Sequence, residues 1–301
     1  MDVWIPITIL AAVAQTARFG LQKQLKLTRL STGGATFARF IYSSPLVALG
    51  VVIYATVTAQ TLPSIPPVFW AYALVGGAAQ ILATMCVVAL FAYRNFAVGI
   101  TFKKTEVLMA AFIGLLILGE GVTWLAFGAI LIGLVGVVLL SDQPGASQDV
   151  WHKRILNRAA GLGLASGVLF ACSGVGYRGA LLSLETGDVL LRATLTLSYV
   201  TTTQTIVMAI WLRLFDRGEI SRVLSTWRVS SLVGITSMIG STCWFVAFTL
   251  QTVAYVKALG QIELLFSLAL TTFLFNEKVS CRELQGGGFL VLSVLVLVLV
   301  T

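Results

Sequence analysis

Charged residues are scarce in this sequence. Only 11% of its 301 residues are Asp, Glu, Lys or Arg, whereas soluble domains typically carry about 25%. Hydrophobic residues make up 58%, and the mean hydropathy is +0.95. A chain of this size and balance cannot cover itself with polar surface, which excludes a soluble globular enzyme. The same composition excludes an intrinsically disordered chain, so an integral membrane protein is expected.

Histidine and cysteine are also rare. His152 is the only histidine, and the four cysteines lie in or beside apolar runs without the spacing of metal ligands: Cys86, Cys172, Cys243 and Cys281. The sequence has no glycine-rich phosphate-binding loop and no motif that pairs a nucleophile with a base. We therefore predict no metal site, no cofactor and no enzymatic activity, and nothing points to an ATP-driven pump.

Long apolar runs dominate what is present. A transmembrane helix needs about 20 largely apolar residues, and the runs lack the alternation of barrel strands. The expected fold is an all-α, multi-pass membrane protein, located in a plasma membrane such as the bacterial inner membrane. Its ten predicted spans are 3–22, 34–57, 68–93, 96–118, 122–140, 159–182, 189–214, 229–250, 252–275 and 283–300.

Basic residues gather in every second gap between these spans, which indicates the orientation of the chain. Positive loops face the cytoplasm, so the gaps after spans 1, 3, 5, 7 and 9 are predicted to be cytoplasmic and both termini to face outward. The basic residues in those gaps are Lys23, Lys26, Arg29, Arg94, Lys153, Arg154, Arg158, Arg213, Arg217, Arg222, Arg228, Lys278 and Arg282.

The two halves of the chain match each other weakly. With an offset of 157 residues, Glu106 falls on Glu263 and Glu120 falls on Glu277. We predict a five-helix repeat over 1–140, a connecting loop over 141–158 and a second repeat over 159–301. Because five is odd, the two repeats must have opposite orientations in the bilayer, as in many secondary transporters.

The region around the repeated carboxylates resembles a known family. The stretch from Phe96 to Glu106 followed by Leu118-Gly119-Glu120, and its counterparts Gln261-Ile262-Glu263 and Phe275-Asn276-Glu277-Lys278, are similar to EamA-type members of the drug/metabolite transporter superfamily. The resemblance implies ten helices in two repeats and a central cavity lined largely by helices 3, 4, 8 and 9. Members usually keep both termini in the cytoplasm, opposite to the orientation that the basic residues indicate.

Charged residues inside predicted spans are functional candidates, because each costs about 2.5–3.5 kcal/mol or more at a helix centre. Lys103 and Glu106 share one face of span 4, and Lys257 and Gln261 share one face of span 9. Inverted repeats would bring the two clusters together near the midplane. The candidate substrate-binding residues are Lys103, Lys104, Glu106, Lys257, Gln261, Glu263, Arg39, Arg192, Trp244 and Tyr255.

Several of these residues have alternative roles. The lysines and glutamates can form salt bridges that join spans 4 and 9, but five cations (Arg39 and Arg192 included) then exceed two carboxylates by three, and an anionic ligand is the simplest partner. Arg192 can instead pair with Asp188. Glu106 and Glu263 can carry protons or bind a substrate amine, and Trp244 and Tyr255 can pack as ordinary span aromatics.

Polar residues elsewhere in the spans favour structural roles. Glu120 and Glu277 are expected to cap the helices that follow them. Gln15, Arg18 and Gln22 share one face of span 1 and can line a cavity, but Arg18 and Gln22 also lie close enough to the predicted interface to be merely solvated. Gln80 favours an interhelical hydrogen bond.

The function expected from these observations is secondary transport of a small polar, anionic or zwitterionic metabolite by alternating access. The expected partners are that metabolite, the lipid bilayer and, if transport is coupled, protons; no nucleic acid is expected. The alternatives are a flippase-like carrier of a lipid-linked head group, an exporter of amines or drugs, and, in a different class, a receptor or scaffold that transports nothing.

Overall fold

The computed structural model describes residues 2–92, 103–141, 158–266 and 281–300. These residues form helices and connecting turns, with no strand among them. The elements are α1 (Trp4–Thr28), α2 (Thr32–Val57), α3 (Pro67–Leu90), α5 (Glu106–Leu118), α6 (Trp124–Ser141), α8 (Arg158–Leu182), α9 (Val189–Phe215), α10 (Glu219–Ser225), α11 (Trp227–Leu250), α12 (Val253–Leu259), the 3₁₀ turn η1 (Gly260–Ile262) and α14 (Cys281–Val300).

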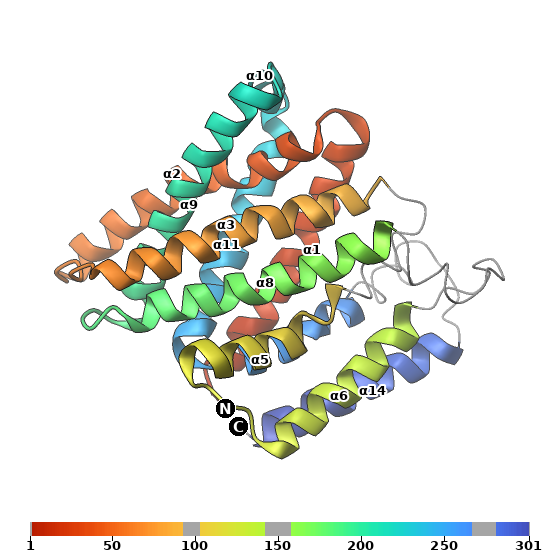
Figure 1. Cartoon of the computed structure of the whole chain (residues 1–301). Helices are drawn as coiled ribbons and strands as arrows, with labels where there is room; N and C mark the ends of the chain where they lie inside the picture. Colours follow the sequence, from red (N-terminus) through yellow and green to blue (C-terminus); the bar gives the residue numbers. More distant parts are fainter. Residues whose placement is uncertain (1, 93–102, 142–157, 267–280, 301) are drawn as a thin grey trace.

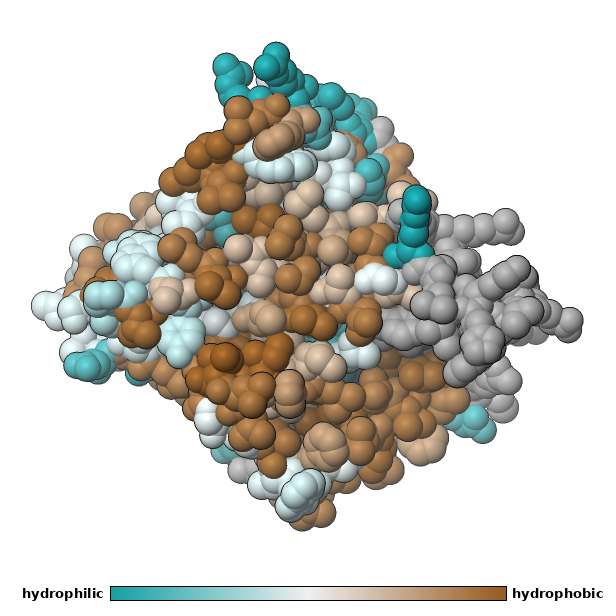
Figure 2. All heavy atoms as spheres, viewed as in Figure 1, coloured by the Kyte–Doolittle hydropathy of each residue, from teal (hydrophilic) through white to brown (hydrophobic). Residues whose placement is uncertain are grey.

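Six of these helices are long and apolar enough to cross a membrane: α1, α2, α3, α8, α9 and α11. Shorter apolar helices cover 106–118, 124–139 and 284–300. Figure 2 shows apolar residues over most of the face in view, while strongly polar residues gather mainly at the top, over α10. Large apolar side chains such as Trp124, Val57 and Leu299 are exposed. A soluble protein rarely exposes so much apolar surface, so the chain is a multi-pass membrane protein.

The long helices pack in pairs that come from distant parts of the sequence. α3 packs on α8, α1 on α11, α2 on α9, and α6 on α14, where the last pair lies to one side of the rest (Figure 1). Glycines permit the closest of these contacts. A Cβ atom at Gly176 of α8 would lie 2.9 Å from the Tyr72 carbonyl oxygen of α3, and one at Gly136 of α6 would lie 2.7 Å from the Gly286 carbonyl oxygen of α14.

Side-chain caps begin two of the long helices. Ser31 Oγ accepts a hydrogen bond of 3.0 Å from the Gly34 amide at the start of α2. Asp188 Oδ1 accepts one of 2.7 Å from the Leu191 amide at the start of α9. Each cap satisfies an amide that has no partner within its own helix. The buried carboxylate of Glu219, in the short helix α10, accepts from the Ser31 amide at 2.5 Å and so also supports the start of α2.

Two predicted spans are interrupted in the structure. The chain turns at Lys104 and Thr105 before α5 begins at Glu106. In span 9, α12 ends at Leu259, the 3₁₀ turn η1 follows, and helical residues resume at Glu263. The remaining parts of these spans, before residue 103 and after residue 266, lie outside the described residues. Both interruptions fall beside the charged residues that the sequence singled out.

Candidate functional site

Two buried ion pairs link the interrupted helices. Lys257 Nζ, from α12, lies 2.7 Å from Glu106 Oε1 at the start of α5. In the second pair the lysine and the glutamate exchange segments: Lys104, from the turn before α5, pairs with Glu263, just after η1. The four side chains are between 3% and 12% exposed. The predicted meeting of the two charge clusters is confirmed, and each carboxylate has its own lysine.

Lys103 joins these pairs into one cluster. Its Nζ lies 3.7 Å from Glu106 Oε2 and 3.9 Å from Glu263 Oε1. Gln15 of α1 donates a 2.8 Å hydrogen bond to Glu263 Oε2. Because removing one member of a buried pair leaves an uncompensated charge, the cluster holds α1, α5 and α12 in one arrangement. The salt-bridge role considered for these residues is therefore present in this conformation.

Aromatic rings surround the lysines. The Lys257 ammonium lies 4.5 Å from the ring centroid of Trp244, and 5.8 Å from that of Phe170. The Lys103 ammonium lies 5.2 Å from the Phe170 centroid. A cation is attracted to an aromatic face at such distances, so these rings supply part of the solvation that the lysines lose on burial.

Arg39 of α2 has a different environment from the lysines. Its guanidinium donates to three hydroxyl groups: Nε to Ser237 Oγ at 2.9 Å, Nη2 to Ser241 Oγ at 3.2 Å and Nη1 to Thr84 Oγ1 at 3.3 Å. The residue is 5% exposed. No carboxylate among the described residues pairs with it. Arg39 therefore carries a buried charge that hydroxyl groups orient but do not neutralise.

Arg18 is a second buried arginine without a carboxylate partner among the described residues. Its Nη1 donates a 2.7 Å hydrogen bond to Gln22 Oε1, and Gln22 donates to the Ala35 carbonyl at 2.9 Å. Arg18 is 3% exposed and Gln22 is fully buried, so the expectation that both are merely solvated is wrong. Gln22 thereby joins α1 to α2. Arg18 and Lys103 both lie near the Phe19 ring, at 4.2 Å and 5.5 Å from its centroid, which places Arg18 beside the cluster.

A narrow cavity separates Arg39 from the Lys257–Glu106 pair. Its aromatic wall comes from Phe170, Phe245, Phe248, Trp244 and Tyr177, and its polar lining includes Gln15, Arg39, Gln80, Ser173, Ser241 and Lys257. About 20 Å³ is open to the centre of a water molecule, which is room for about one water. The cavity is thus too small for a metabolite in this conformation.

A polar network closes one side of this cavity. The Tyr177 hydroxyl donates to Gln80 Oε1 at 2.9 Å, and Gln204 Nε2 donates to the same oxygen at 3.0 Å. Gln204 also donates to the Gly77 carbonyl at 3.0 Å. The interhelical hydrogen bond expected for Gln80 is confirmed, and it joins α3, α8 and α9.

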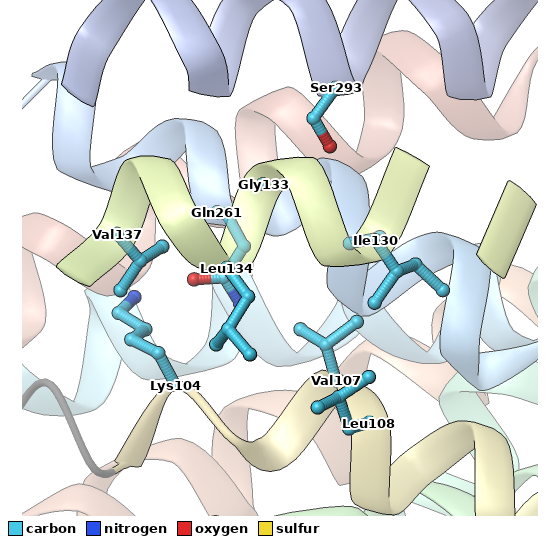
Figure 3. Close-up of a pocket in the computed structure, with 10 residues that line it drawn as sticks. Lys104, Val107, Leu108, Ile130, Gly133, Leu134, Val137, Gln261 and Ser293 are labelled. Atoms are coloured by element: carbon cyan, nitrogen blue, oxygen red, sulfur yellow. The ribbon is translucent and has the colours of Figure 1, made fainter. Parts of the chain in front are cut away.

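A second, smaller pocket lies on the other side of the cluster. Lys104 reaches into it beside Gln261, with Ser293 of α14 above them (Figure 3). Apolar side chains of α5 and α6 form the rest of the wall, including Val107, Leu108, Ile130, Leu134 and Val137. Gln261 Oε1 is buried and has no hydrogen-bond partner within the described part of the chain. Gln261 therefore faces away from the cavity that contains Arg39.

The other predicted site residues divide between the cavity and the periphery. Trp244 lines the cavity. Tyr255 does not, because its hydroxyl accepts from the Thr123 amide at 3.4 Å, at the start of α6. Arg192 Nη2 donates to the Leu181 carbonyl at 2.9 Å, at the end of α8. The structure therefore does not bring Arg192 or Tyr255 to the charge cluster.

The alternative considered for Arg192 is also wrong. The Asp188 carboxylate is occupied by Tyr54 at 2.7 Å and Gln60 at 2.8 Å, not by the Arg192 side chain. The surplus of three positive charges nevertheless persists near the cluster, because Arg18 takes the place that the sequence interpretation gave to Arg192. Four buried cations (Arg18, Arg39, Lys103 and Lys104) and Lys257, which is 12% exposed, lie around two carboxylates there.

Glu120 has a structural partner that the sequence did not indicate. It accepts from Arg178 Nε at 2.6 Å and 2.7 Å, instead of capping a helix. Arg178 also donates to the carbonyls of Phe248 and Gln251, at the end of α11. The structural role expected for Glu120 fits this ion pair, whereas its counterpart Glu277 lies outside the described residues.

Sequence reasoning missed the residues that hold Arg39. Ser237 and Ser241 are spaced i, i+4 in span 8, which places them on one helix face, but such hydroxyls in a membrane helix usually bond to their own backbone. Thr84 lies at i, i+4 from Gln80, so the sequence indicates an interhelical hydrogen bond or a substrate contact for it but not Arg39 as its partner. Phe170 carried no signal, since single aromatics are common in apolar runs.

No protein-family model matches this sequence, and no curated protein matches it. The fold does match solved structures. One of them superposes with a TM-score of 0.74 over 98% of this chain and 96% of that chain, at 13% sequence identity, and is described only as "Crystal structure of protein". A likeness at this identity concerns the fold alone.

Proposed function

We propose that this chain is a secondary transporter of the drug/metabolite transporter type. It is built from two inverted five-helix repeats, and it moves a small polar metabolite with a carboxylate or phosphate group by alternating access. The packing of the long helices supports two repeats. The first repeat contains α1, α2, α3, α5 and α6, and the second contains α8, α9, α11, α12 and α14 in the same order. When each helix is replaced by its counterpart, the α3–α8 contact becomes the α11–α1 contact, and the α2–α9 and α6–α14 contacts are unchanged.

The observation that carries the proposal is the matched interruption of two helices at the buried charges. With the offset of 157 residues, the turn at Lys104 and Thr105 before Glu106 falls on Gln261 and Ile262, the last two residues of the 3₁₀ turn before Glu263. Transporters with inverted repeats bind substrates and ions where membrane helices are discontinuous near the midplane. The matched interruption favours a functional role over a static scaffold, because a continuous α-helix is the regular way to satisfy the backbone inside a membrane.

The excess of positive charge supports an anionic or zwitterionic substrate. Five largely buried cations around two carboxylates are costly without an anion or water among them. The small cavity corresponds to a state without substrate. In this state the ion pairs Lys257–Glu106 and Lys104–Glu263 hold the two interrupted helices together, and their separation would let one side of the cavity open.

Flux across a membrane tests this proposal directly. The purified protein is reconstituted into liposomes, and uptake from a mixture of radiolabelled carboxylates, organic phosphates, amino acids and amines is compared with protein-free liposomes. We expect saturable uptake of carboxylates, phosphates or zwitterions, with loss of at least tenfold in Lys103→Gln and Lys257→Gln.

Other outcomes would support the alternatives. Uptake confined to amines would indicate an exporter of cations, in which Glu106 and Glu263 bind the substrate. Movement of a labelled lipid between leaflets without solute uptake would indicate a flippase. Binding of solutes without flux would indicate a receptor. Unchanged uptake in both lysine variants would remove the cluster from the site.

A further inference from the structure

Arg39 and the lysines differ in how their charges are compensated. Every lysine of the cluster has a carboxylate oxygen within 4.0 Å, and the distance from Lys257 to Glu106 is only 2.7 Å. Arg39 bonds only to the hydroxyls of Ser237, Ser241 and Thr84. These hydroxyls come from α11 and α3, so two helices position one guanidinium that neither neutralises.

The position of Arg39 makes it available to a ligand. It lines the cavity whose opposite side holds Lys257 and whose wall is aromatic. A guanidinium carries five N–H donors, and three are used by the hydroxyls. Two donors therefore remain on a planar group that suits the two oxygens of a carboxylate or phosphate.

We propose that Arg39 binds the anionic group of the ligand, while Ser237, Ser241 and Thr84 position its guanidinium. The lysine–glutamate pairs then serve chiefly to join the interrupted helices. This inference rests on the proposed transport function and assigns one step of it, the selection of anions, to a residue outside the charge cluster. The aromatic wall favours ligands with an apolar or planar body beside the anionic group.

Arg178 provides an internal control for the stability of a buried arginine. It is 9% exposed and Arg39 is 5% exposed, but Arg178 pairs with Glu120 and two backbone carbonyls. Substitution of Arg178 leaves a carboxylate without its partner. Substitution of Arg39 leaves only hydroxyls, and a serine or threonine in a helix can bond to the carbonyl four residues earlier.

The first experiment compares the melting temperatures of Arg39→Met and Arg178→Met without ligand. We expect Arg178→Met to melt about 5 °C or more below the wild type, as for a broken buried ion pair. Arg39→Met should melt within about 2 °C of the wild type or above it. An equal loss in both variants would show that Arg39 is a structural residue and would overturn the proposal.

The second experiment measures anion preference with a matched pair of probes. Benzoate and its neutral counterpart benzamide have the same planar body, and inorganic phosphate serves as an anion without one. We expect benzoate to raise the melting temperature of the wild type more than benzamide does. Arg39→Met should lose this difference. Arg39→Lys keeps the positive charge but not the planar guanidinium that can bind two oxygens, so it should bind benzoate about tenfold more weakly.

The outcomes separate this inference from the transport proposal. A wild type that prefers neither anion, or an Arg39→Met variant that keeps the preference, would overturn the role of Arg39. Anion-selective flux that survives Arg39→Met would overturn it as well, while leaving transport intact. Anion binding that depends on Arg39 but is accompanied by no flux would support the site and refute transport.

Discussion

At the scale of single residues, the partners of a buried charge decide its role. Lys257 and Arg39 line the same cavity, yet one faces a carboxylate and the other faces hydroxyls. The Lys257–Glu106 ion pair joins α12 to α5. The hydroxyl-bound guanidinium gains orientation but keeps its charge, and such a charge inside a membrane is retained where it serves a ligand.

The coupling between Lys257 and Glu106 can be measured with a double-mutant cycle. Lys257→Met leaves Glu106 with only the more distant Lys103, so we expect the free energy of unfolding to fall by about 2–4 kcal/mol. The double variant Glu106→Gln/Lys257→Met should recover part of this loss, because it leaves no carboxylate without its partner. Unfolding in mixed micelles with increasing denaturing detergent gives the four free energies. Strictly additive losses would contradict a direct interaction.

At the scale of helices, the cap of α9 also ties two helices together at the membrane border. Asp188 accepts from the Leu191 amide and from Tyr54 at the end of α2. Partial burial raises the pKa of Asp188, but the hydrogen bonds from Tyr54, Leu191 and Gln60 outweigh this effect, so its pKa lies below the usual value. The lowered pKa means that the carboxylate stabilises the fold while it is ionised.

Asp188→Ala should therefore destabilise the protein by about 1 kcal/mol near neutral pH. A carboxyl group with a lowered native pKa contributes stability above its unfolded pKa, about 3.9, and loses it as the pH falls through the native value. The difference between wild type and Asp188→Ala should thus be constant above about pH 5 and shrink below about pH 4. Melting curves across this range measure it, and a difference independent of pH would contradict an ionised cap.

Close helix packing gives a second prediction at this scale. A side chain at Gly176 would meet the backbone of α3, at Tyr72 and Gly76, which cannot yield as a side chain can. We expect Gly176→Leu to separate α3 from α8 and to lower the melting temperature by several degrees. Gly161→Leu on the same helix is the control, because no atom lies within 4 Å of a Cβ there. Equal melting temperatures for the two variants would contradict the contact.

The sequence predicted the apolar helices well but not their interruptions. Apolar runs correctly located the six long helices, with borders within several residues of the predicted spans, because length and hydropathy alone decide which segments the bilayer accepts. The breaks at Lys104–Thr105 and Gly260–Ile262 contain no proline, so no strong local signal marks them. The short helix α10 was missed because a tertiary contact supports it. This contact is the hydrogen bond from the Ser31 amide to the buried carboxylate of Glu219.

The charged residues of the candidate site could be predicted from the sequence, but the groups that they contact could not. The repeated carboxylates and the lysines beside them identified the cluster, because a charge in an apolar run is conspicuous. Arg18 and Arg192 exchanged roles because distance from a span end does not tell which helix covers a side chain. Arg18 is buried and bonds to Gln22, whereas Arg192 donates to a carbonyl at the end of α8.

At the scale of the whole molecule, the two ends of the chain and the basic loops can be compared. Figure 1 places both termini at one end of the bundle and α10 at the opposite end. α10 lies in the gap after the seventh predicted span, which carries Arg213, Arg217, Arg222 and Arg228. Ten spans would place both termini on the same side, and both the number of spans and the side of the membrane stay predictions.

Fusions at the carboxyl end can determine that side. Because positive loops stay in the cytoplasm, we expect alkaline phosphatase fused after Thr301 to be active and green fluorescent protein fused there to be dark, since each works on one side only. The same reporters inserted after Gly218, beside α10, should give the reverse result. If the carboxyl-terminal fusion fluoresces, the orientation usual in the resembling superfamily holds, and the basic loops lie outside. The side of the membrane from which an anion enters toward Arg39 would then also change.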